Sequence, residues 1–148
     1  MPKFPPLLGS LLLLVATTGC SQPDDRKPAF AVTGKALFKG QPMAGARITF
    51  HPLGESDQRA LRPTTQVDEA GTFRLTTYFK DDGAPAGEYA VTIYWPQKPA
   101  AKEQADDPNA DIRDLPPDRL NRVYALPTTT PLRATVRAQS NTIDFSLP

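Results

Sequence analysis

Few residues in this sequence have reactive side chains, and their spacing forms no catalytic set. The chain has one cysteine, Cys20, and one histidine, His51. His51 stands between Phe50 and Pro52 in a segment that alternates apolar and polar residues, so we expect it on the solvent face or at the end of a strand. A zinc or iron site would need several carboxylates as well, and none is spaced for one. The sequence therefore predicts no catalytic residue, cofactor or metal.

Two acidic pairs are the remaining candidates for chemistry. Asp68-Glu69 and Asp81-Asp82 are each followed closely by a glycine, as in tight turns. Their surroundings lack the dense oxygen ligands that Ca²⁺ prefers, so turn formation is the better interpretation. A carboxylate site near Asp68, Asp81 and Asp82 is the alternative, in which the protein is a hydrolase or an accessory enzyme subunit.

Aromatic residues could form a platform for a sugar or a peptide. Trp95 shares the parity of Tyr89 and Ile93 in one alternating segment, which favours a place in the core. Tyr94 has the opposite parity and is expected to be exposed. The candidate surface and binding residues are Tyr78, Asp81, Asp82 and Tyr94.

The elements that would position these residues are short strands. From Phe30 onward, apolar and polar residues alternate with period two, which is typical of strands with one buried face. No segment of useful length has helical spacing. Glycine, proline, asparagine and aspartate separate the alternating segments, so we expect a single antiparallel β-sandwich of about seven strands. The residues expected to dominate its core are Phe50, Phe73, Tyr89, Ile93, Trp95, Ile143 and Phe145.

One region interrupts this pattern. Residues 96–119 are rich in charged residues and proline and contain almost no apolar side chains. Such a stretch cannot bury enough surface to offset the entropy lost on ordering. We therefore predict a long mobile polar loop within the domain.

The N-terminal segment has the features of an export signal. Lys3 precedes an apolar stretch at residues 7–16, and small residues then lead to Cys20. The stretch is too short for a comfortable membrane span. It resembles a bacterial lipoprotein signal, which implies that residues 1–19 are removed and that Cys20 is acylated as the new N-terminus. The alternatives are an ordinary secretory signal followed by a free thiol, or a start codon placed too early.

Residues 20–29 are polar and contain two prolines, and we interpret them as a flexible spacer between the acylated cysteine and a domain at residues 30–148. The lipoprotein resemblance implies a protein exported and anchored by lipid to the cell membrane or outer membrane, facing the periplasm or the cell surface. The formal net charge is only +1, and no cluster of Lys and Arg occurs, which argues against nucleic-acid binding. Acylation of Cys20 would also leave no thiol for a disulfide or a metal.

Three motifs carry a resemblance to a known domain family. Residues 32–50, 65–75 and 83–93 resemble, in order and spacing, the opening strands, the hairpin and the Pro-Ala-Gly-Glu-Tyr strand start of carboxypeptidase regulatory-like domains. That family has a transthyretin-like (prealbumin-like) fold. The tail at residues 124–145 is similar to small planctomycete-type lipoproteins with this domain.

Together these features predict a membrane-anchored lipoprotein of the cell envelope. We expect it to be a non-catalytic module that binds or scaffolds a protein or a polysaccharide. The carboxylate enzyme described above is one alternative. A purely structural envelope component is the other.

Overall fold

The computed structural model describes residues 1–2, 26–54, 60–97 and 116–148. The predicted signal segment, Cys20 and most of the predicted polar loop lie outside these ranges. The described residues form strands and turns but no helix, and so none that could cross a membrane. This confirms the all-β fold class.

Seven of the described strands have three or more residues, and four have two. The longest is β8, which runs through the centre of one sheet. The strands are β1 (Ala29–Phe30), β2 (Val32–Phe38), β3 (Gln41–Pro42), β4 (Arg47–Pro52), β5 (Thr64–Gln66), β6 (Thr72–Arg74), β7 (Ala84–Pro85), β8 (Gly87–Tyr94), β9 (Arg133–Val136), β10 (Asn141–Thr142) and β11 (Phe145–Leu147).

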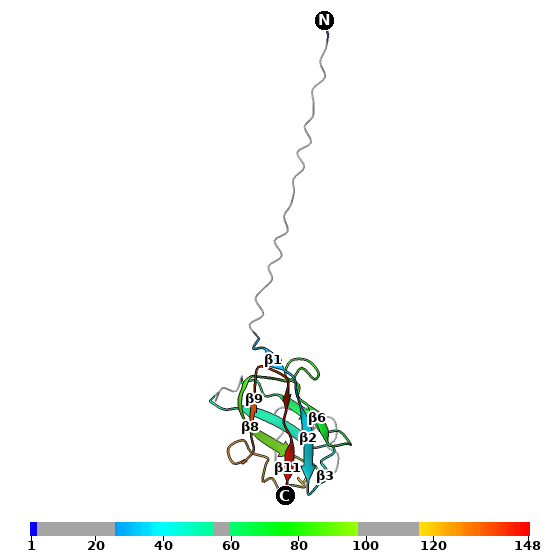
Figure 1. Ribbon diagram of the computed structural model, residues 1–148, viewed down its shortest axis with the longest axis vertical. Coiled ribbons are helices and arrows are strands. Elements are labelled where there is room, and N and C mark those ends of the chain that lie inside the picture. The colour runs from blue at the N-terminus through cyan, green and yellow to red at the C-terminus, as the bar shows by residue number, and fades with distance from the viewer. Residues whose placement is uncertain (3–25, 55–59, 98–115) are drawn as a thin grey trace.

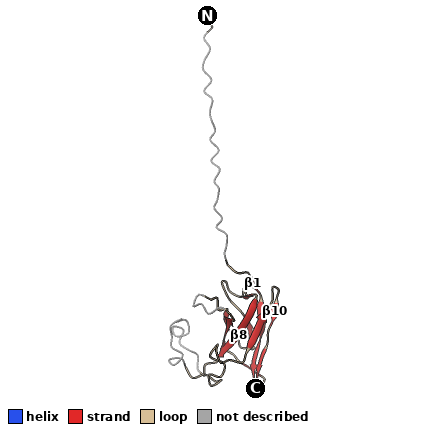
Figure 2. Cartoon of the chain, turned by 90° about the vertical axis from the view of Figure 1, so that its left-hand side faces the viewer, coloured by secondary structure: helices blue, strands red, loops and turns tan. Residues whose placement is uncertain are grey.

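The longer strands belong to two sets on opposite sides of the domain. One sheet has the order β5-β4-β8-β9 and is antiparallel throughout. The other is built around β2, which pairs with β3, β6, β10 and β11. Figure 2 shows β8 and β10 on opposite sides of the domain. A separate pair, β1 with β7, joins the start of the described domain to the segment before β8.

The second sheet differs from the antiparallel arrangement expected from the sequence. Both β10 and β11 run parallel to β2, for example with Phe145 opposite Ala36. The reason is that the chain leaves β9 in one sheet and crosses to the other, so no hairpin forces the strands to run in opposite directions. Asn141 shapes that crossing, since its side-chain oxygen accepts a hydrogen bond from the Arg137 amide at 2.9 Å.

The two sheets enclose the core that the alternation predicted. Phe145 lies between them, with its ring centroid 6.3 Å from that of Phe50 and 5.9 Å from that of Phe73. Trp95 is buried, and its indole Nε1 donates to the carbonyl oxygen of Ala44 at 2.8 Å. Of the predicted core residues, only Ile143 is half-buried, packed against the edge of the cluster. Burial of these side chains is the main stabilising contribution to the fold.

Gly34 lets the two parallel strands approach β2 closely. A Cβ at this position would overlap the carbonyl oxygen of Ile143 and press on the ring of Phe73. The amide of Ile143 donates to the Thr33 carbonyl oxygen at 2.9 Å. The close approach therefore belongs to the backbone hydrogen bonding between β2 and the segment that contains β10 and β11. A strand glycine permits such a close approach of two backbones.

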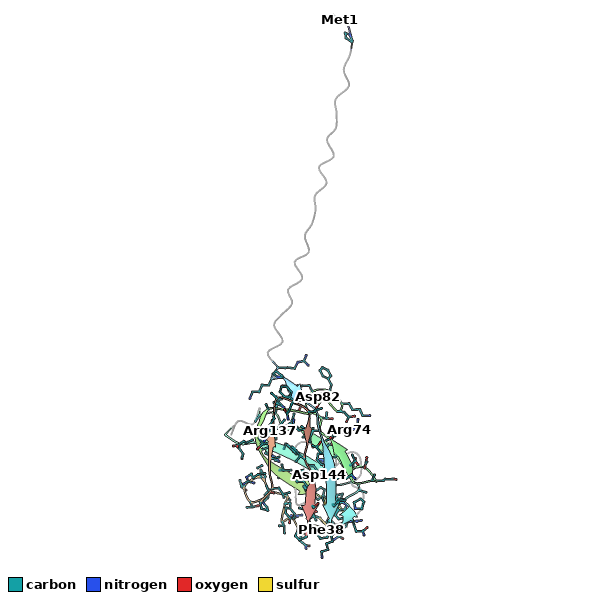
Figure 3. All side chains as sticks on the ribbon, viewed as in Figure 1. Met1, Phe38, Arg74, Asp82, Arg137 and Asp144 are labelled. Carbon is teal, nitrogen blue, oxygen red and sulfur yellow. The ribbon has the colours of Figure 1, made fainter. Side chains whose placement is uncertain are left out.

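The domain has two distinct ends (Figure 1). Residues 26–30 and the connection 75–83 between β6 and β7 form one end, which we call the spacer end. Residue Phe38, β3 and the last residues of β11 form the other, which we call the far end. Figure 3 places Asp82 at the spacer end and Phe38 at the far end.

Candidate functional site

The connection between β6 and β7 at the spacer end contains three of the predicted surface residues. Asp82 shapes it, because its carboxylate accepts hydrogen bonds from the amides of Thr77 at 2.7 Å, Tyr78 at 2.9 Å and Phe79 at 2.9 Å. Burial acts to raise the pKa of Asp82, but these amide hydrogen bonds outweigh it and lower the pKa. The side chain therefore builds a turn, as expected of Asp81-Asp82-Gly83.

Phe79, Lys80 and Asp81 are the outward residues of the same turn. Asp81 is exposed and has a left-handed backbone with φ of 62°, and its amide donates to the Thr76 hydroxyl at 3.0 Å. Phe79 has 64% of its surface exposed, which is unusual for a large aromatic side chain. Phe79, Lys80 and Asp81 are the parts of this loop that a partner could contact.

The chain leading into the domain is attached to this loop through Arg26. Its guanidinium carbon lies 5.5 Å from the ring centroid of Tyr78 and 5.2 Å from that of Phe79, within cation–π range. Tyr78 is half-buried, and its hydroxyl oxygen is enclosed with no hydrogen-bond partner among the described residues. Tyr78 is therefore not the open aromatic platform that the sequence suggested.

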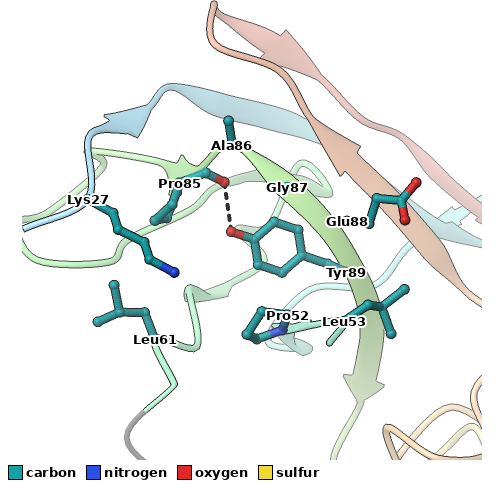
Figure 4. Close-up of a pocket in the computed structure, with 9 residues that line it drawn as sticks. All are labelled: Lys27, Pro52, Leu53, Leu61, Pro85, Ala86, Gly87, Glu88 and Tyr89. Carbon is teal, nitrogen blue, oxygen red and sulfur yellow. Dashed lines mark hydrogen bonds between the residues drawn. The ribbon is translucent and has the colours of Figure 1, made fainter. Parts of the chain in front are cut away.

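A small cavity lies beside the spacer end, between the segment that precedes β1, the ends of β4 and β7, and the start of β8 (Figure 4). Its volume is about 70 Å³, far below the several hundred Å³ of typical small-molecule sites. Tyr89 forms one wall, and its hydroxyl donates to the Pro85 carbonyl oxygen at 2.7 Å. The cavity can hold water-sized groups but not a sugar ring. Its lining residues are Lys27, Pro52, Leu53, Leu61, Pro85, Ala86, Gly87, Glu88 and Tyr89.

Tyr94, the fourth predicted surface residue, lies in a different place. It ends β8, and its hydroxyl donates to the Pro116 carbonyl oxygen at 2.7 Å. Burial, and then the nearby charge of Asp118, raise the pKa of Tyr94. Tyr94 is half-buried, so the structure separates it from Asp81 and Asp82 and also covers part of its ring.

Asp118 is a site residue that the sequence did not single out. It is 5% exposed, and its carboxylate accepts hydrogen bonds from the amides of Trp95 at 2.9 Å, Leu120 at 3.1 Å and Arg122 at 2.9 Å. It thus joins the end of β8 to the segment that follows residue 117. The sequence signal that could have revealed it is an aspartate directly after two prolines, a pattern typical of a side chain that shapes its own backbone.

The predicted mobile loop at 96–119 differs from the structure at both of its ends. Pro96 and Asp118 form a β-bridge, and the Gln97 amide donates to Pro117 at 2.9 Å. Arg119 places its guanidinium 4.6 Å from the ring centroid of Trp95. The two ends are therefore held together, while residues 98–115 lie outside the described residues.

The turn segment at residues 120–127 continues from Asp118 at the far end. Its backbone contacts the edge of β8, where the Ile93 amide donates to Tyr124 at 2.9 Å. Val123 and Leu126 are 55% and 46% exposed, although both are apolar. This segment is the second place where the domain presents apolar side chains to its surroundings.

The structure does not bring the three carboxylates of the alternative enzyme site together. Asp68 precedes β6 and accepts hydrogen bonds from the amides of Ala70 at 3.0 Å and Thr72 at 2.8 Å. Asp81 and Asp82 follow β6 at its other end. Among residues 26–54, 60–97 and 116–148, no group of three or more His, Cys, Asp or Glu side chains could hold a metal ion.

His51 lies on β4 as predicted, but it is half-buried rather than solvated. Its ring Nε2 is 2.9 Å from the hydroxyl oxygen of Thr92 on the neighbouring strand. Burial, and then the charge of Arg62, lower the pKa of His51 and favour the neutral ring. With the Thr92 hydroxyl as its partner, the imidazole supports the sheet surface.

No protein-family model matches the chain, and neither a curated protein nor a solved structure was found to be similar to it. The candidate residues form two surfaces: the spacer end, with Asp81 and Phe79, and the far end, with Val123 and Leu126.

Proposed function

We propose that the chain is a lipid-anchored lipoprotein of the cell envelope, exported by the segment at residues 1–19 and acylated on Cys20. In this proposal its domain is a carboxypeptidase regulatory-like, transthyretin-like module without catalytic activity. It binds or scaffolds a protein or a polysaccharide outside the cytoplasm.

One observation carries the non-catalytic part of the proposal. The side chains of the described domain that could act as acids, bases or ligands instead hold its backbone in place. Asp68, Asp82 and Asp118 each accept hydrogen bonds from two or more backbone amides, and His51 pairs with a hydroxyl. Groups engaged in this way hold loops in place, so the domain is better suited to presenting a surface than to reacting.

The exposed apolar residues of the far end favour a protein partner over a polysaccharide. Val123 and Leu126 project from a turn segment whose first residues are held by Asp118, since its carboxylate accepts a hydrogen bond from the Arg122 amide. Aliphatic side chains at a rigid turn match the apolar centre of a protein interface. The far end also lies opposite the chain entering from Cys20, so an anchored domain would present it away from the membrane.

The anchor is tested by mass spectrometry of the mature N-terminus. We expect a chain that begins at Cys20 and carries the added mass of two or three acyl chains. The variant Cys20→Ser should lose that mass and leave the membrane fraction. Recovery of the unprocessed chain from the cytosol would refute export and anchoring together.

The partner surface is tested by cross-linking in cells. A photoreactive residue in place of Val123 should give a reproducible protein adduct, and one in place of Arg74, which is exposed on β6, should not. When the photoreactive residue is placed at a third position on the same turn, the protein adduct should form in the wild-type background. It should be lost when Val123→Asp and Leu126→Asp are both present. Equal labelling from positions 74 and 123 would argue against a far-end interface.

The enzyme alternative is tested most directly at Asp81. Because Asp82 builds the turn, its removal would confuse loss of fold with loss of activity. Asp81→Ala leaves the three amide hydrogen bonds of Asp82 in place. A hydrolytic activity of the wild-type chain that disappears in a folded Asp81→Ala variant would support the alternative.

A further inference from the structure

The spacer end presents an aromatic side chain at the place where the chain enters the domain. Phe79 is 64% exposed, yet its backbone is fixed, because its amide donates to the Asp82 carboxylate at 2.9 Å. Arg26 lies 5.2 Å from its ring centroid and so attaches the incoming chain to the same loop. A single exposed phenylalanine is unremarkable by itself. Its position next to the incoming chain gives it significance.

The length of chain between Cys20 and this surface is short. Only five residues separate Cys20 from Arg26, and six residue steps span at most about 20 Å when fully extended. A flexible chain of that length has a typical end-to-end distance of about 13 Å. A domain of roughly 120 residues is about 35 Å across. The spacer is therefore shorter than the domain, and an anchored Cys20 keeps the spacer end close to the bilayer.

We propose that the domain docks onto the lipid bilayer through the spacer end, with Phe79 inserted at the membrane–water interface. This inference rests on the lipid anchor of the proposed function. Aromatic side chains are favoured at that interface, and the lipid anchor greatly raises the effective concentration of bilayer surface around Phe79. Docking would orient the domain and direct the far end away from the membrane.

The charges of the spacer end indicate which forces drive this contact. Basic and acidic residues nearly balance there, so attraction to anionic lipid adds little. We therefore expect docking to depend on Phe79 and to be nearly independent of salt and of lipid charge. The charged residues of this end and of the preceding spacer are Asp24, Asp25, Arg26, Lys27, Lys80, Asp81 and Asp82.

The test uses the full acylated lipoprotein reconstituted into vesicles. Once Cys20 is acylated the chain has no thiol, so a single introduced cysteine can carry a fluorescent label. One protein carries the label at Lys80→Cys beside Phe79, and a matched control carries it at Gln41→Cys, exposed at the far end. The vesicles contain phosphatidylcholine, with or without phosphatidylglycerol, and a nitroxide-labelled lipid that quenches probes at the interface.

The expected result is strong quenching of the label at position 80 and little quenching of the label at position 41. The extent of quenching should be similar in both lipid mixtures and at high salt. Adding Phe79→Ser should lower the docked-to-undocked ratio at position 80 by about ten-fold or more. Thermal unfolding of the Phe79→Ser protein checks that the loop change leaves the fold intact, since Phe79 is mostly exposed.

Each other outcome has a defined meaning. If the protein does not float with the vesicles, the anchor itself is refuted, and docking with it. If the protein floats but the two labels are quenched equally weakly, docking is refuted while the anchor stands. If the fluorescence of the label at position 80 changes with the number of protein molecules per vesicle and not with the nitroxide lipid, the surface binds a second copy of the chain. Membrane docking is then refuted.

Discussion

Asp118 offers the sharpest test of how this domain is held together. The substitution Asp118→Ala removes a buried carboxylate that accepts hydrogen bonds from three backbone amides, those of Trp95, Leu120 and Arg122. It leaves the Trp95 amide without its acceptor in a buried position. The two segments on either side of residues 98–115 would then be joined mainly by the two backbone hydrogen bonds of the Pro96–Asp118 bridge and by the hydrogen bond from the Tyr94 hydroxyl to Pro116.

The size of the effect can be estimated from these contacts. A hydrogen bond to a charged group contributes about 1.5–3 kcal/mol, and a buried donor left without a partner costs about 1–3 kcal/mol. Because the three bonds share one carboxylate, they do not add fully, and we expect a loss of about 3 kcal/mol. This is a large share of the roughly 5–15 kcal/mol by which domains are stable. At a slope near 2 kcal/mol per molar urea, the midpoint should fall by about 1.5 M.

Equilibrium unfolding in urea, followed by fluorescence, measures this loss directly. Trp95 is the only tryptophan and is buried next to Asp118, so its emission reports both the site and the fold. Asp118→Asn is the matched control, since one oxygen can still accept from Trp95 and Leu120 and only the Arg122 bond is lost. We expect a loss of about 1 kcal/mol for this variant.

Two results would refute this account of Asp118. One is an unfolding free energy for Asp118→Ala within about 0.5 kcal/mol of the wild-type value, the range typical of ordinary surface substitutions. The other is an Asp118→Asn variant as unstable as Asp118→Ala, which would show that negative charge and not the set of amide bonds matters. Arg119→Ala serves as a neighbouring control and should cost only about 0.5–1 kcal/mol, because it removes an exposed cation–π contact with Trp95.

Three further changes test other parts of the structure. Gly34→Ala should destabilise the domain by roughly 1–3 kcal/mol in thermal unfolding, because the new Cβ overlaps the Ile143 carbonyl oxygen; an unchanged melting temperature would contradict the close approach. Asp82→Asn should be less stable than wild type at neutral pH, and the difference should shrink as pH falls below 3.8 through the lowered folded-state pKa, measured by urea unfolding across pH. His51→Gln should remove a loss of stability that the wild type shows as pH falls below 6.5, because the folded state disfavours the charged ring; parallel pH profiles for the two proteins would contradict this.

Local pattern was enough to determine the fold class and most of the core. Alternation predicted that Tyr89, Ile93 and Trp95 are buried, and the structure confirms it, although Ala90 and Thr92 on the other face of β8 are buried as well. Asp68 and Gly71 likewise predicted their turn, because an aspartate side chain bonds nearby amides and glycine accepts a positive φ. These properties depend on residues a few positions apart, which a sequence displays directly.

Tertiary structure alone decided which surfaces exist and what the polar residues do. The parallel pairing of β11 with β2 depends on contacts such as that of the Lys35 amide with Asp144, 109 residues away in sequence. Arg26 reaches the Tyr78 ring, and Asp118 reaches the Trp95 amide, only because packing brings separate segments together. Period and composition describe which face of a strand is buried, but the identity of a strand's neighbour is set by the complementarity of the whole packed core.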